Sequence, residues 1–143
     1  MGGEEALGAI AADRRVRAVV AEGATSRVAA DNGWLDDEHG WRGRFQQGVD
    51  EITEMITDQL TAASPPIALR SAAVAASPRP VLLIAAGGVP DEIAADRWIA
   101  SASPSNVSVW VAPGASHTGA LRARPAEWEA RVIAFLDRAL EGR

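Results

Sequence analysis

The sequence predicts an α/β fold: a partial doubly wound parallel sheet of about three strands with flanking helices and a helical lid insertion. Two observations predict it. Three short, nearly continuously apolar runs each end in glycine or Pro-Gly, a pattern typical of strands buried on both faces of a parallel sheet. Helical patterns lie between and around these runs, and such alternation indicates helical crossovers between parallel strands.

The expected elements follow one another along the chain. A helix rich in Ala, Glu and Leu is expected over 2–12, and the first strand within 17–23 (RAVVAEG). The second strand is expected within 80–87 (PVLLIAAG), and apolar residues at helical spacing predict a helix over 91–103. The third strand is expected within 107–114 (VSVWVAPG).

The last helix, over 125–140, has the clearest pattern. Pro125 stands where a first helical residue is favoured, and Glu127 and Glu129 lie in the first turn, where the helix dipole favours acids. Its apolar face is formed by Trp128, Val132, Phe135, Leu136 and Leu140.

Residues 24–77 interrupt the alternation. They include an amphipathic helix, then Ser-Pro-Pro at 64–66, and an Ala-rich helix at 67–76. The apolar side of the amphipathic helix is formed by Phe45, Val49, Ile52, Ile56 and Leu60. This segment is too long for a plain crossover, so we expect a lid or substrate wall over the strand ends. The chain as a whole, 1–143, is expected to be one portion of a single domain.

The composition excludes some classes of function. The chain has 143 residues, 48% hydrophobic and 23% charged, with a net charge of −5 and no cysteine. Disulfides and thiolate chemistry are therefore excluded, and a nucleic-acid partner is not expected without a basic face. No apolar run is long enough for a bilayer and no signal-peptide pattern opens the chain, which predicts a cytoplasmic protein without a membrane partner.

Two candidate catalytic groups come after successive predicted strands. Asp91 lies in GGVPDE and His117 in PGASHTG. Ligands bind beyond the carboxyl ends of strands in open parallel sheets, and an acid followed by a histidine supplies two parts of a charge-oriented base. Asp91 could instead only cap the following helix, in which case Glu92 is the substitute acid.

Other candidate sites carry weaker signals. His39 with Asp36 and Asp37 matches no zinc or calcium spacing, and a solvated loop is the favoured interpretation. Ser26 and Ser116 do not stand in a strand-to-helix elbow, so neither is expected to be a nucleophile. No metal ion or cofactor is expected, since the AAGG turn lacks the other features of a phosphate-binding loop.

The chain resembles the C-terminal part of an α/β-hydrolase, of the dienelactone-hydrolase and peptidase-like branch. The resemblance rests on PVLLIAAGGVPDE, VSVWVAPGASHTG and PAEWEARVIAFLDRAL, in that order. The opening MGGEEALGAI is similar to the segment on the C-terminal side of the serine in the G-x-S-x-G motif. Met1 matches the residue after the serine, and Gly2 matches the closing glycine.

The resemblance implies a serine hydrolase that cleaves a small ester or amide. Asp91 would be the triad acid, His117 the base and the Met1 amide an oxyanion-hole donor. The serine would stand before Met1, so the chain is expected to be inactive alone.

The alternative is a non-enzymatic α/β interaction or regulatory module, or a subunit that a separate N-terminal half completes. In the family's sheet the strand within 17–23 would have two neighbours, and its open edge would favour a homo-oligomer or the complementing half.

Overall fold

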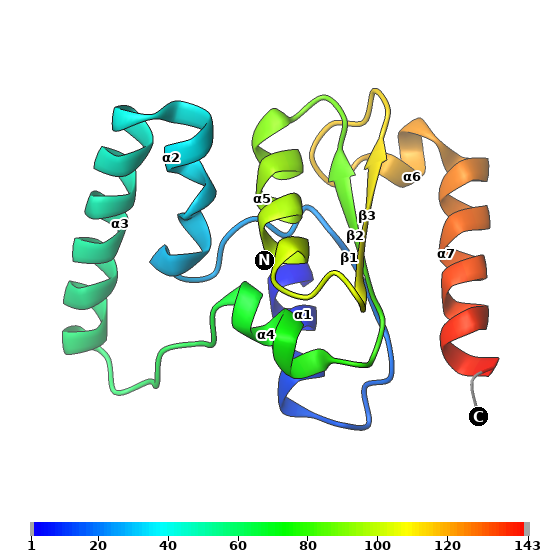
Figure 1. Cartoon of the computed structure of the whole chain (residues 1–143), viewed down its shortest axis with the longest axis horizontal. Helices are drawn as coiled ribbons and strands as arrows, with labels where there is room; N and C mark the ends of the chain where they lie inside the picture. Colours follow the sequence, from blue (N-terminus) through cyan, green and yellow to red (C-terminus); the bar gives the residue numbers. More distant parts are fainter. Residues whose placement is uncertain (1, 142–143) are drawn as a thin grey trace.

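The computed structural model describes residues 2–141 and contains a three-stranded parallel sheet. The strands are β1 (Val19–Glu22), β2 (Val81–Ala86) and β3 (Val107–Ala112), in the order β1-β2-β3 (Figure 1). Their carboxyl ends therefore meet at one edge of the sheet. The three predicted strands and their parallel arrangement are confirmed.

Helices make up most of the remaining chain. In order these are α1 (Gly2–Ala12), the 3-10 turn η1 (Ala29–Asn32), α2 (Trp34–His39), α3 (Trp41–Leu60), α4 (Leu69–Ala76), α5 (Pro90–Ser101), α6 (Ala120–Ala123) and α7 (Pro125–Glu141). The helix expected from residue 91 begins one residue earlier, at Pro90, because a fixed proline φ suits the first helical turn. No helix among residues 2–141 combines the length and the apolar character needed to cross a bilayer.

Two apolar cores lie on opposite faces of the sheet. On one face α1, α4 and α5 pack against alternate strand residues, among them Leu83 of β2. On the other face lies α7 (Figure 1), whose Val132 and Phe135 pack against Leu82 and Trp110. Neighbouring strand residues point to opposite faces, and all six residues of β2 are buried, as the continuous apolar run predicts.

A buried carboxylate organises the segment between β1 and α4. Asp31 is fully buried, and its Oδ2 accepts the backbone N–H groups of Arg27 at 2.9 Å and Val28 at 3.1 Å. Its Oδ1 accepts the N–H of Leu69 at 2.6 Å, which ties η1 to the start of α4. Burial raises the pKa of the Asp31 carboxyl and outweighs the backbone hydrogen bonds that lower it.

Helix α3 confirms the predicted amphipathic helix, but its apolar side is exposed. Phe45 is 70% and Leu60 is 83% exposed. The opposite side of α3 is held to the chain by polar contacts: Asp50 accepts a hydrogen bond from Asn32 Nδ2 at 2.7 Å, and Glu54 accepts one from the N–H of Ala29, also at 2.7 Å. Helix α3 therefore lies at one end of the molecule, beyond α2 (Figure 1).

Candidate active site

A carboxylate and an imidazole from two different strand ends meet above the sheet. His117 lies in the loop after β3, and Glu92 lies in the first turn of α5, just after β2. His117 Nδ1 is 2.5 Å from Glu92 Oε1. Glu92 is only 2% exposed, and its Oε2 accepts the N–H of Ala86 at 3.0 Å. Both carboxylate oxygens thus have a partner, which fixes the acid for the histidine.

The end of β1 supplies the floor beneath the imidazole. Gly23 has a φ of +68°, a conformation that residues with a side chain rarely adopt. A Cβ at this position would lie 2.8 Å from His117 Cε1 and 3.1 Å from its Nδ1. The missing side chain of Gly23 therefore leaves the space that the histidine ring occupies.

A second acid holds the histidine loop. Glu22, the last residue of β1, accepts the N–H of Ala120 through its Oε1 at 2.7 Å. Ala120 begins α6, three residues after His117. Glu22 was not among the site residues predicted from the sequence, although an acidic residue that closes an otherwise apolar strand was a signal for it.

The structure places the first-choice acid elsewhere. The side chain of Asp91 is 60% exposed, and its Oδ1 lies 3.4 Å from His39 Nε2 rather than beside His117. Consecutive helical residues point about 100° apart, so when α5 starts at Pro90 only the second of the two acids turns toward the β3 loop. The partner of His117 is therefore Glu92, the substitute acid. The predicted oxyanion donor, Met1, lies outside the described residues.

A third carboxyl group lies one helical turn beyond Glu92. Asp96 is 1% exposed, and neither of its oxygens has a hydrogen-bond partner within the described chain. Burial, with the nearby charges of Glu92 and Glu4, raises the pKa of Asp96 to about 8. Asp96 is thus largely protonated at neutral pH and places little negative charge beside Glu92.

This geometry is suited to proton transfer at Nε2 of the imidazole. A carboxylate acceptor at Nδ1 favours the tautomer with the proton on Nδ1 and an unprotonated Nε2. The side chain of His117 is 63% exposed, and residues 2–141 offer its Nε2 no hydrogen-bond partner. The same residues contain no group of three or more His, Asp or Glu side chains placed to hold a metal ion.

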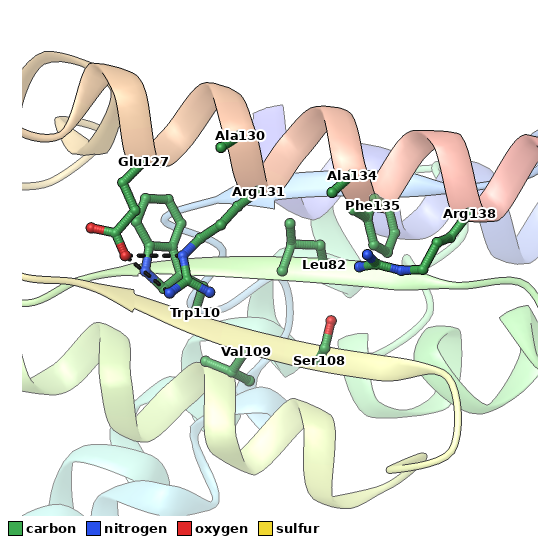
Figure 2. Close-up of a pocket in the computed structure, with 10 residues that line it drawn as sticks. All are labelled: Leu82, Ser108, Val109, Trp110, Glu127, Ala130, Arg131, Ala134, Phe135 and Arg138. Carbon is green, nitrogen blue, oxygen red and sulfur yellow. Dashed lines mark hydrogen bonds and ion pairs between the residues drawn. The ribbon is translucent and has the colours of Figure 1, made fainter.

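A separate cavity lies between α7 and the strands β2 and β3. It has a volume of about 550 Å³, and its walls include Leu82, Phe135 and Trp110 (Figure 2). The Arg131 guanidinium stacks 5.0 Å from the centre of the Trp110 ring and pairs with Glu127 at 3.0 Å (Figure 2). The lining of this cavity contains no histidine, so we place the candidate site at the strand ends, where Glu92 and His117 meet.

The strand ends thus bring together Glu22, Gly23, Glu92 and His117 from three parts of the chain. Two of these, Glu92 and His117, stand in the order acid then histidine that the sequence predicts. Comparisons with protein-family models, with curated proteins and with solved structures give no match to this chain.

Proposed function

We propose that Glu92 and His117 are the acid and the base of a serine hydrolase acting on esters or amides. The observation that carries this proposal is the 2.5 Å contact between a buried carboxylate and an exposed imidazole at the carboxyl ends of parallel strands. Ligands of open parallel sheets bind at this edge. The order acid then histidine also agrees with the resemblance to α/β-hydrolases of a doubly wound fold.

The proposed reaction is acyl transfer in two steps. A serine hydroxyl attacks the carbonyl carbon of the substrate while His117 Nε2 takes its proton, and Glu92 stabilises the imidazolium that forms. The imidazolium then protonates the leaving alcohol or amine, which leaves an acyl-serine. Water attacks the acyl-serine, gives a proton to His117 and releases the acid, and the proton returns to the serine oxygen. The resemblance would place this serine directly before Met1.

We further propose that residues 24–77 form a wall or lid of this site. In support, α2 reaches the start of α5 through the contact of His39 Nε2 with Asp91 Oδ1 at 3.4 Å. Asp91 is adjacent to Glu92 in the chain, so a movement of α2 would act next to the acid. Lids and substrate walls are commonly carried by such inserted segments.

A fluorophosphonate probe tests the hydrolase. The chain of residues 1–143 is compared with the longer product of its reading frame that includes the residues encoded before Met1. We expect labelling of the longer product alone, with loss of labelling in His117→Ala and a strong decrease in Glu92→Leu. The matched control is Asp91→Leu on the same helix, which should label normally. Labelling of the shorter chain, or a frame without Gly-X-Ser before Met1, would refute the proposal.

A second candidate is an interaction module, and one observation favours it. Within residues 2–141, β1 pairs with β2 alone, so no described strand pairs with the backbone donors and acceptors of its other edge. An added strand from another chain would complete the sheet. Hydrogen exchange tests this: a partner that adds a strand should slow exchange along β1, whereas unchanged exchange with any candidate partner bound speaks against it.

A further inference from the structure

Helix α3 carries a continuous apolar stripe that is exposed in the described chain. The stripe consists of Trp41, Phe45, Val49, Ile52, Ile56 and Leu60. Their exposed fractions are 68%, 70%, 41%, 57%, 51% and 83%. Single exposed apolar residues are ordinary, but contiguous patches of this kind mark interaction surfaces.

We propose that the α3 stripe binds the same stripe of a second copy of the chain, with the two helices antiparallel. The steps between successive stripe residues are four, four, three, four and four, so the spacing is the same in both chain directions. A twofold axis between residues 50 and 51 therefore places Trp41 opposite Leu60, Phe45 opposite Ile56 and Val49 opposite Ile52. Such self-complementarity is what a twofold interface requires.

The area of the stripe also fits a pair of chains. With Met55, which is 55% exposed beside it, the stripe exposes on the order of 800 Å² of side-chain surface, similar to the contribution of each partner to a standard interface. Helix α3 lies at one end of the molecule (Figure 1), so two copies can meet there. The inference does not depend on the proposed hydrolase activity, because Glu92 and His117 lie at the strand ends.

Sedimentation equilibrium of residues 1–143 over a range of concentrations tests the pairing. We expect a monomer–dimer equilibrium whose dissociation constant rises at least 100-fold in Ile52→Asp. The matched control is Val74→Asp on α4, where the replaced valine is 52% exposed and lies outside the stripe, and it should dimerise as the unchanged chain does. Circular dichroism verifies that each variant remains folded.

A chain that stays monomeric at every concentration, or a dimer that Ile52→Asp leaves intact, would overturn the proposal.

Discussion

Replacing Asp96 by asparagine should remove a specific loss of stability with rising pH. Asp96 is 1% exposed, lacks hydrogen-bond partners within the described chain, and has its pKa raised by burial and by the charges of Glu92 and Glu4 from an ordinary value of 3.8 to about 8. Between pH 3.8 and about pH 8, Asp96 keeps its proton in the folded chain and has lost it in the unfolded chain. The stability is therefore fully present below pH 3.8 and falls as the pH rises toward 8.

The size of the effect depends on the width of that window. Each pH unit contributes about 1.4 kcal/mol, so the roughly three units between the ordinary value of the pKa and neutral pH give an upper bound of about 4 kcal/mol. Asparagine has the same size and never ionises, so Asp96→Asn should gain about 2–4 kcal/mol over wild type between pH 4 and pH 7. Such a gain is large beside the whole stability of a typical domain.

Urea unfolding at half-unit steps from pH 4 to pH 9, followed by tryptophan fluorescence, measures this difference. The two stability curves should meet near pH 4, diverge up to about pH 8 and run parallel above it. The control is Asp91→Asn, which makes the same substitution on the same helix at a side chain that is 60% exposed; its curve should follow that of wild type. Parallel curves for Asp96→Asn and wild type over the whole range would refute the reasoning.

Two further predictions concern the fold and the site. Asp31→Asn should destabilise the chain by about 2–4 kcal/mol, because an amide cannot accept all three backbone N–H groups that the carboxylate accepts. Urea unfolding measures the loss of stability, with Asp37→Asn at an exposed side chain as the control. Equal unfolding midpoints for the two variants would contradict the prediction. Gly23→Ala should displace the His117 ring, seen as a change of its ring-nitrogen resonances in long-range ¹H–¹⁵N spectra. Gly40→Ala, at another positive φ with nothing within 4 Å, should leave those resonances unchanged, and an unmoved ring in Gly23→Ala would contradict the packing.

The sequence contains enough to predict the sheet and the histidine loop. Strands that are buried on both faces leave continuous apolar runs, and these were found at each of the three positions. The sequence pattern could not decide between Asp91 and Glu92, since that choice depends on the residue at which α5 begins. A shift of one position rotates a side chain by about 100°, and only the folded helix shows that Glu92 faces His117.

Tertiary contacts explain the remaining gaps. The apolar side of α3 would ordinarily indicate a buried face, but α3 is attached through the polar contacts of its other side. In the sequence Asp31 cannot be told from any other acid in a loop. Of the three backbone N–H groups that donate to it, two are local and the third belongs to the distant Leu69. The role of Glu22 likewise depends on its hydrogen bond with Ala120, and no local sequence pattern connects these two residues.

The bond between Glu22 and Ala120 has a consequence for folding. It joins two residues 98 positions apart, and the floor of the imidazole, Gly23, is about as distant from His117 in the chain. Contacts of such long range close a large loop and cost more chain entropy than local contacts. The candidate site therefore requires β1 to be in place, since Glu22 and Gly23 hold and make room for the loop and ring of His117.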